Sequence, residues 1–527
     1  ARNSVEAVSV CLLHAYRNPA HEERVLQIVQ EELPRVPVTI SSMISREYKE
    51  YPRASTTSIN AALVPKMSPY LSDFEDGVRA LGIRSPLHLF TSGGGVIGAP
   101  VARQQPVQLL ESGPAAGVIG AAFIARSVGA DSALALDIGG TTAKAAIIQD
   151  GQPQLATEFE VGAAAVATVT ATRGKGYPVQ TPVISLIEIG AGGGSIAHID
   201  PGGFLALGPQ SAGAMPGPVC YSQGGTEPTL TDANLVLGRL NPAFFLGGDR
   251  PLDRNAASAV IEEKIARPLK LTVEEAAASI VQIADAKMAA ALRLISVGQG
   301  IDPRSYPLVP SGGGGALHAV SIARSLDVTK LIVPPTPGLN SALGLLVSDI
   351  RHDFVTTWMR DVSKSSVADI RAAVARMEQD GLALLASENV PPERIEIEAK
   401  LDVSYVGQGY SLRIDAPLDR SDEDFLDDVT ERFHAAHTQV YGFDSRANGV
   451  RIVNLRLAAK GRVDGFRLRS PESGSPDAAA ALKGRRKVYF AGKDWVNCPV
   501  YDRRLLSPGT RLSGPTVIEQ MDTSTLL

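Results

Sequence analysis

Apolar segments alternate with amphipathic ones over the first part of the chain. Residues 5–15 are mostly apolar, and a helical period follows over 19–32. A second apolar segment, PVTISS, precedes a mostly helical pattern over 55–82, and LHLFTSGGG then runs into a glycine turn. This alternation predicts strands separated by helices, and therefore a partly parallel sheet with helices on its faces.

The pattern resumes at ADSALALDIGG and changes in character near residue 365. Thr272 and Glu275 have the spacing of a capping box, and the small residues that follow have a helical period, which predicts a long helix. Further on, IEIEAKLDVSYVGQGYSLRIDAP alternates as antiparallel strands do, and 421–441 has a helical pattern. Residues 470–486 are rich in Ser, Pro and charge, which predicts an exposed linker before a small β-rich module.

Composition narrows the class of protein. The chain has 527 residues, of which 44% are hydrophobic and 20% charged, as in ordinary globular proteins with several domains. A net charge of -5 gives no general attraction to nucleic acid or anionic membranes, and no apolar run approaches 18 residues. The three cysteines form no metal or disulfide pattern. We therefore expect a cytoplasmic protein without nucleic-acid or membrane partners.

Five glycine-rich turns are candidates for binding an anion: TSGGG (91–95), ESGPAAG (111–117), DIGGTT (137–142), GAGGGS (190–195) and SGGGG (311–315). Glycine lets backbone N–H groups approach a phosphate closely. DIGGTT is neither a Walker loop nor a dinucleotide fingerprint, because the chain returns directly to a strand, AKAAII. Two interpretations are open: a phosphate-binding turn, or a plain hairpin in which Asp137 caps the turn.

Several motifs carry a family resemblance. In chain order they are EYPRASTTSINA, SGGGV, ESGPAAG, DIGGTTAK, IGAGGGSIAHID, GPQSAGAMPGPVCY, PTLTDANLVLGRL, SGGGGALHA and PGLNSALGLLVSD. They span about 45 to 350 and resemble the hydantoinase/oxoprolinase family, specifically its large ATP-using, hydantoinase A-like subunit. That family is related to acetone and acetophenone carboxylase subunits. The tail, with SYVGQGYSLRI, VNLRL and SGPTVIEQ, matches more weakly.

The resemblance implies an α/β fold with actin/sugar-kinase/Hsp70-like ATPase lobes and an additional α+β C-terminal region. We expect the remainder of a first lobe over 1–130, a second lobe over 131–360, an α+β domain over 361–469, and the linker and β-rich module over 470–527. Relatives usually begin with an earlier DxGGTFTD loop, which this sequence lacks, and strand-like segments stand at both ends. We therefore expect a chain truncated or processed at both ends.

The resemblance also assigns roles around ATP and Mg²⁺. Asp137 would hold the metal ion through its water ligands, because Mg²⁺ dehydrates reluctantly. The catalytic residues would be Asp137, Thr141, Thr142 and Lys144. Cofactor-binding residues would be Gly139 and Gly140 at the phosphates and Gly312, Gly313, Gly314 and Gly315 on the adenosine side. Lys144 stands where many relatives have Asp, and Glu188 where many have His.

Further candidates for contacting substrate or metal are Glu188, Ser195, His198 and Asp232. Each has a structural alternative: Glu188 as a polar strand end, His198 as a structural histidine, and Asp232 with Asn234 as a helix cap. Cys220 is either a nucleophile or a small buried thiol.

The expected activity is ATP-dependent hydrolysis of a cyclic amide, a hydantoin or a 5-oxoproline-like ring. An amide resists hydrolysis, and phosphorylation of its oxygen creates a group that water can open. Two alternatives are the activating subunit of an ATP-dependent ketone carboxylase and a non-catalytic ATP-binding scaffold. By the same resemblance, the chain would work in a hetero-oligomer with a second, hydantoinase B-like subunit.

Overall fold

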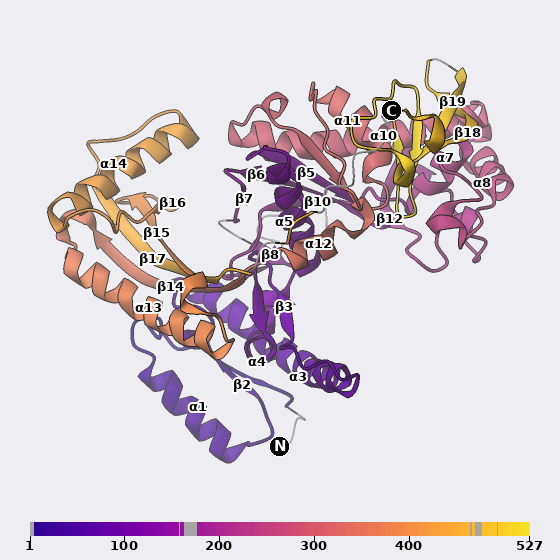
Figure 1. The fold of residues 1–527 in the computed structure, drawn as a ribbon. Coiled ribbons are helices and arrows are strands. Elements are labelled where there is room, and N and C mark those ends of the chain that lie inside the picture. The colour runs from indigo at the N-terminus through magenta and orange to yellow at the C-terminus, as the bar shows by residue number, and fades with distance from the viewer. Residues whose placement is uncertain (1–4, 157–158, 163–175, 464–465, 469–476, 493) are drawn as a thin grey trace.

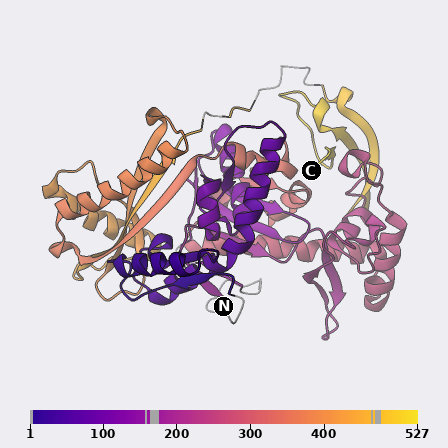
Figure 2. The ribbon, with the colours of Figure 1, turned by 90° about the horizontal axis from the view of Figure 1, so that it is seen from below.

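The computed structural model describes residues 5–156, 159–162, 176–463, 466–468, 477–492 and 494–527, and it has a mixed α/β fold (Figure 1). The views in Figures 1 and 2 agree that α13 and α14 lie at one end of the molecule and the C-terminal strands at the other. In the described part of the chain, no helix combines the length and apolar character needed to cross a membrane.

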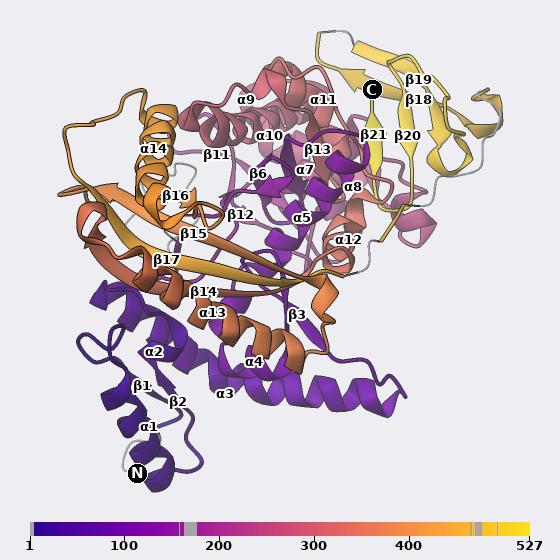
Figure 3. The ribbon, with the colours of Figure 1, turned by 60° about the vertical axis from the view of Figure 1, so that its left-hand side comes forward.

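The N-terminal region is a small α/β unit beside a long helix (Figure 3). Strands β1 and β2 pair in parallel. The elements are β1 (Val8–Val10), α1 (Ala20–Glu32), β2 (Val38–Ile40), α2 (Ser41–Ile44) and α3 (Glu50–Ala80). The expected strand over 5–15 ends early because side chains bind the backbone of Leu12: Glu22 accepts from its N–H at 2.8 Å, and Arg53 donates to its carbonyl at 2.9 Å.

The central sheet has the strand order β10-β6-β5-β13, with β7 paired to β6. Strands β5 and β6 form an antiparallel hairpin, and β13 runs parallel to β5. Helix α5 packs on β5 and β13, and α10 packs on β6. The elements are α5 (Ser112–Ser127), β5 (Ala133–Ile138), β6 (Ala143–Gln149), β7 (Gln152–Pro153), β10 (Leu186–Ile189), α10 (Val273–Ser296), β13 (Leu308–Ser311) and α11 (Gly315–Ser325).

The chain also forms smaller elements outside this sheet, including two separate two-stranded sheets. They are β8 (Phe159–Val161), β9 (Tyr177–Val179), β11 (Ser195–Ile199), β12 (Leu205–Ser211), α7 (Leu230–Val236), the short helix η3 (Phe245–Gly248), α8 (Arg254–Ile261), α9 (Arg267–Leu269) and α12 (Asn340–Leu346). The capping box predicted at Thr272 and Glu275 is confirmed at the start of α10. The mixed α/β class is thus confirmed, while the actin-like arrangement of lobes stays a prediction.

A six-stranded sheet with the order β16-β15-β17-β14-β4-β3 joins distant segments of the chain. Its strands are β3 (His88–Phe90), β4 (Val96–Gly98), β14 (Ile350–Asp361), β15 (Ile395–Tyr405), β16 (Leu412–Asp415) and β17 (Val450–Gly461). The helices between them in the chain include α4 (Ala99–Gln104), α13 (Val367–Ser387) and α14 (Asp422–Tyr441). Strand β4 pairs with β14 at Val96 and Ile350. The sheet therefore spans the predicted domain boundary at residue 360, and those boundaries stay a prediction.

The C-terminal module is a four-stranded sheet, β18-β19-β20-β21. Its strands are β18 (Leu482–Phe490), β19 (Asp494–Asp502), β20 (Val517–Glu519) and β21 (Ser524–Leu526). The prediction of a linker up to residue 486 was wrong for 482–486, which begin β18, whereas 469–476 lie outside the described residues. The charged residues of this segment suggested an exposed linker, but Lys483 and Arg486 form ion pairs with the buried Glu519.

Helices α5 and α12 pack unusually closely, through small residues. A Cβ atom on Gly344 would lie 1.9 Å from the carbonyl oxygen of Ala116, and one on Gly120 would lie 2.3 Å from that of Asn340. The Asn340 amide donates to the carbonyl of Gly117 at 2.8 Å. Since these are backbone contacts, rotation of a side chain cannot relieve the crowding.

We predict that Gly344→Ala lowers the free energy of unfolding by about 3 kcal/mol, the upper range for overpacking a well-packed interior. Thermal and urea denaturation followed by circular dichroism would measure the loss. Gly113→Ala, on the exposed start of α5, is the matched control, because its Cβ would meet no atom within 4 Å. Equal stability of the two variants would contradict the close packing.

Candidate functional site

Three of the five glycine turns meet at the tip of the β5–β6 hairpin. The N–H of Gly193 donates to the carbonyl of Gly139 at 3.0 Å, and the N–H of Gly194 donates to that of Gly140 at 2.6 Å. From the other side, the N–H of Gly314 donates to the carbonyl of Ile138 at 3.1 Å. The turns at 137–142, 190–195 and 311–315 therefore form one backbone assembly.

Close backbone approach explains why glycine is needed at two of these positions. A Cβ on Gly192 would lie 2.6 Å from the carbonyl carbon of Thr141. Gly312 has a φ of +76°, and its Cβ would lie 2.4 Å from Oδ1 of Asp137. Any other residue would push the turns apart or displace the Asp137 carboxylate.

Four polar residues form a row across the end of the central sheet. Ser311 on β13 pairs with Asp137 on β5, which pairs with Lys144 on β6, which pairs with Glu188 on β10. Directly paired residues project from the same face of a sheet, so these side chains share one surface. The strand order thus brings together Asp137, Lys144 and Glu188, which the sequence analysis singled out separately.

Lys144 links this row to the turn. Its Nζ donates to Oγ1 of Thr142 at 2.5 Å and lies 3.5 Å from Oε1 of Glu188. Burial raises the pKa of Asp137, and the positive charge of Lys144 partly offsets that rise. The carboxylate of Asp137 is therefore short of water and would be stabilised by a second cation.

Glu111 is a site residue that the sequence analysis did not select. It stands before the first residue of α5 with φ 58° and ψ 21°, a left-handed conformation that is unusual for a residue with a side chain. Gly117, two turns into α5, would place a Cβ 3.1 Å from Oδ2 of Asp137, so this helix packs directly against the row. The signal was present, because Glu111 opens the glycine-rich ESGPAAG stretch.

The pKa of Glu111 is raised, chiefly by loss of water around its carboxylate, and two residues of the row also influence it. Glu111 is exposed, but nearby protein displaces enough water from its carboxylate to raise the pKa. The negative charge of Glu188 raises the pKa further, and Lys144 opposes both effects. Glu111 is thus electrostatically coupled to the row and better able to take up a proton than an ordinary surface carboxylate.

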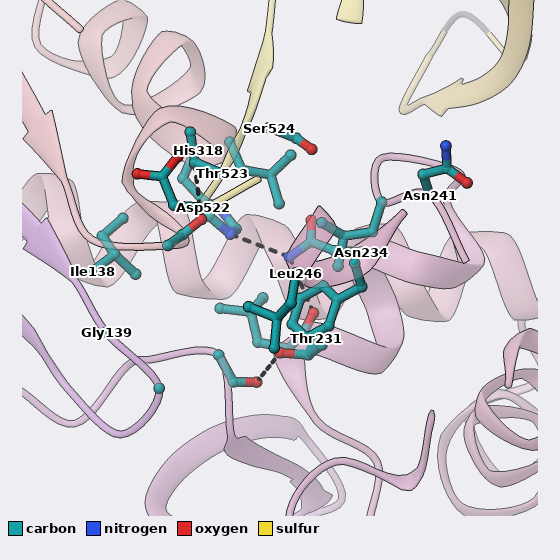
Figure 4. Close-up of a pocket in the computed structure, with 18 of the residues that line it drawn as sticks. Ile138, Gly139, Thr231, Asn234, Asn241, Leu246, His318, Asp522, Thr523 and Ser524 are labelled. Carbon is teal, nitrogen blue, oxygen red and sulfur yellow. Dashed lines mark hydrogen bonds between the residues drawn. The ribbon is translucent and has the colours of Figure 1, made fainter. Parts of the chain in front are cut away.

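A cavity beside the glycine turns is open to solvent, and its empty space, part of that solvent included, is about 930 Å³. Gly139, Gly140, Gly193, Gly313 and Gly314 line one part of it, and Leu240, Phe244, Phe245 and Leu246 supply apolar surface. Figure 4 shows Asp522, Thr523 and Ser524 at the same cavity. This C-terminal contribution was not predicted, because no local pattern relates these residues to the glycine turns.

Polar groups at one side of the cavity form a buried chain. Nδ1 of His318 lies 2.6 Å from Oδ1 of Asp285, and Nε2 lies 3.2 Å from the side-chain nitrogen of Asn234 (Figure 4). The Asn234 nitrogen also donates to the carbonyl of Leu230 at 3.1 Å. Among the described residues, the buried Oδ1 of Asn234 has no hydrogen-bond partner. An unpaired buried oxygen is costly, so this side chain suits a site that a polar ligand completes.

The remaining candidates do not gather around the cavity. Ser195 is buried, and its Oγ accepts from the N–H of Gly192 at 2.8 Å, so it stabilises the glycine turn. His198 is exposed on β11. Asp232 is fully buried and completes a capping box with Thr229, as the helix-cap alternative predicted. Its carboxylate also accepts from the N–H of Cys220 at 2.8 Å.

Cys220 is a buried thiol whose pKa is raised, chiefly by burial and further by the charge of Asp232. Because only the thiolate is a good nucleophile, this environment opposes the nucleophile alternative. Within the described residues, no three His, Cys, Asp or Glu side chains are grouped to hold a metal ion. A metal bound through one carboxylate and water, as expected for Mg²⁺ at Asp137, does not need such a group.

The donor set at the hairpin tip fits an anionic ligand with a cation. No group of the described residues accepts a hydrogen bond from the N–H of Gly140 or Thr141, and both residues are exposed. Two adjacent free N–H groups beside the Thr141 and Thr142 hydroxyls suit phosphate oxygens. The water-poor carboxylate of Asp137 suits a hydrated divalent cation at the same place.

The fold and this glycine-turn site are those of a known class of proteins: the chain belongs to the hydantoinase/oxoprolinase family. The hydantoinase/oxoprolinase family model matches residues 53–354, and the model of the family's C-terminal domain matches residues 359–527. Together the two models cover nearly all of the chain, which confirms the resemblance inferred from the motifs.

Particular relatives include both hydrolases and carboxylases. The chain is 34% identical to the caprolactamase subunit alpha of Pseudomonas jessenii, over 99% of this chain and 74% of that protein. The crystal structure of the ATP-dependent caprolactamase from Pseudomonas jessenii superposes with a TM-score of 0.87 and 32% identity, over 100% of this chain and 75% of that one. A nucleotide-free acetone carboxylase structure superposes with a TM-score of 0.76 and 27% identity, over 99% and 74%.

Proposed function

We propose that this chain binds ATP in the cavity beside the glycine turns and uses it to phosphorylate the oxygen of a cyclic amide, which water then opens. The observation that carries the proposal is the convergence of three glycine turns on Asp137, next to a cavity large enough for a small ligand. The likeness to a caprolactamase supports a lactam or a related ring, such as a hydantoin or 5-oxoproline, as substrate.

In this proposal the nucleotide phosphates lie at the hairpin tip. The free N–H groups of Gly140 and Thr141 and the hydroxyls of Thr141 and Thr142 hold phosphate oxygens, while Gly313 and Gly314 face the nucleoside. Asp137 holds Mg²⁺, which supplies charge neutralisation to the phosphates when bound. Lys144 is already fixed by Thr142 and Glu188, so its positive charge is aimed at the same region.

Glu111 is the group we assign to proton transfer. As the amide oxygen bonds to the γ-phosphorus and the bond to ADP breaks, the amide nitrogen loses its proton, and the Glu111 carboxylate accepts it. Water then adds to the activated ring carbon, and the C–N bond breaks as the nitrogen takes up protons, which leaves an open-chain acyl phosphate. A second water hydrolyses the acyl phosphate and gives the open-chain amino acid and inorganic phosphate. A carboxylate with a raised pKa is a more effective base near neutral pH than an ordinary one.

A second subunit could supply the groups that hold the ring substrate. The relative from Pseudomonas jessenii is named as the alpha subunit of its enzyme, and the site described here contains groups for handling phosphate but no identified group that holds a ring substrate. We propose that a hydantoinase B-like subunit completes the enzyme as a hetero-oligomer.

The decisive experiment measures ADP release by the chain with its partner subunit across hydantoins, 5-oxoproline, caprolactam, and ketones with bicarbonate. Stimulation by a cyclic amide without bicarbonate is the expected result. Stimulation only by a ketone together with bicarbonate would replace this proposal by the carboxylase function, which the acetone carboxylase likeness makes the second candidate. ATP binding without turnover on any substrate would favour a scaffold role.

We predict that Asp137→Asn lowers substrate-stimulated ADP release by at least about 100-fold, because it removes the charge that holds the cation beside the phosphates. Steady-state ADP release measures the effect. Asp150→Asn is the matched control, since Asp150 is exposed at the far end of strand β6 from the turn. Similar activity in both variants would mean that the 137–142 stretch is a plain hairpin.

We predict that Glu111→Gln lowers turnover by about 100-fold or more and removes the acidic limb of the pH–rate profile. In the native enzyme that limb reflects protonation of Glu111, and it lies above the usual carboxyl range because the pKa is raised. Glu393→Gln, at an exposed position on the α13–α14 side, is the control. An unchanged acidic limb in Glu111→Gln would assign proton transfer to another group.

A further inference from the structure

The turn between β20 and β21 forms one wall of the cavity, and it contains none of the glycine motifs. Gln520, Met521, Asp522 and Thr523 all line the cavity, although the glycine turns lie two hundred or more residues earlier in the chain. Asp522 is the single carboxylate among the described residues that line it. Because a carboxylate and a phosphate repel each other, this carboxylate would contact another part of a bound nucleotide.

One hydrogen bond fixes this turn to the adenosine-side glycine turn, and two more fix it to the segment 335–338. The Thr523 hydroxyl donates to the carbonyl of Gly313 at 2.9 Å, and the N–H of Gly338 donates to Oδ2 of Asp522 at 2.8 Å. The Gln520 amide donates to the carbonyl of Pro335 at 2.9 Å. The position of Asp522 is therefore set before any ligand arrives.

The other side of the module is anchored through a buried carboxylate. Glu519 is 1% exposed and accepts from the Asn241 amide at 3.0 Å, from Lys483 at 2.7 Å and from Arg486 at 2.5 Å. Burial alone would raise the pKa of Glu519, but the Lys483 and Arg486 hydrogen bonds outweigh it and hold the pKa below the usual range. Glu519 stays charged at neutral pH, so the module is held firmly against the segment after α7.

One oxygen of the Asp522 carboxylate is free to accept a hydrogen bond from a ligand. Oδ2 accepts from Gly338, whereas Oδ1 accepts no hydrogen bond from the described residues. The carboxylate repels phosphates, which the proposed function places at Gly139 and Gly140, so its partner on a bound nucleotide is a hydrogen-bond donor of the nucleoside. Hydroxyl groups donate strongly to carboxylates, and the ribose carries two of them between base and phosphates.

We propose that Asp522 accepts a hydrogen bond from a ribose hydroxyl of the bound nucleotide and so selects ribonucleotides over deoxyribonucleotides. The inference rests on the proposed function, since it assumes that this cavity holds the nucleotide. It makes Asp522 a specificity-determining residue, which touches the nucleoside and takes no part in phosphoryl transfer.

Isothermal titration calorimetry of the full chain with its partner subunit, using ADP, 2′-deoxy-ADP and 3′-deoxy-ADP, tests the inference. We expect ADP to bind about tenfold or more tightly than at least one deoxy analogue, the usual value of a hydrogen bond to a charged group. In Asp522→Asn the preference falls to within about threefold. Asparagine keeps an oxygen for Gly338, so the turn retains its position.

Asp249→Asn is the control, because it removes an exposed carboxylate next to η3 that does not line the cavity, and it should keep the native preference. Equal binding of ADP and both deoxy analogues to the native enzyme would overturn the inference and leave the proposed function intact. An equal loss for all three nucleotides in Asp522→Asn would overturn it as well. No binding of ADP at all would overturn both.

Discussion

The close approach of backbone to backbone at the tip of the β5–β6 hairpin is the constraint on which the site depends. Hydrogen bonds from Gly193 and Gly194 on one side and from Gly314 on the other fix the tip between two further turns. This contact leaves no room for side chains at Gly192 and Gly312. The absence of Cβ atoms lets the three turns converge at the hairpin tip.

Acidic groups outnumber basic ones around that tip, where the three carboxyl groups of Asp137, Glu188 and Glu111 share the single positive charge of Lys144. Lys144 lies between Glu188 and the turn, while burial raises the pKa values of both Asp137 and Glu111. Each of these carboxylates lacks part of its hydration and would gain from a bound cation. A cation bound there, as the proposed function requires, would be stabilised by both carboxylates.

The sequence predicts this molecule well where local rules suffice. The capping box at Thr272 and Glu275, the helix over 421–441 and the cap at Asp232 follow from spacing and side-chain chemistry, and the structure contains all three. The row of Asp137, Lys144 and Glu188 could be predicted only in part, because its members meet through strand order. Asp522 depends on contacts between distant segments, which no local pattern signals, whereas Glu111 opens the glycine-rich ESGPAAG stretch and could have been selected. The buried role of Arg486 was missed because charge usually indicates exposure.

The six-stranded sheet has a consequence for how the protein is made. Strands β3 and β4 complete it only by pairing with β14, which follows the whole central sheet in the sequence. As the ribosome releases the chain, β4 therefore has an unpaired edge until β14 emerges, and such edges attract other chains. Contacts between residues so far apart also slow folding. We expect the nascent protein to need shielding by chaperones during this interval, a requirement set by strand order and independent of catalysis.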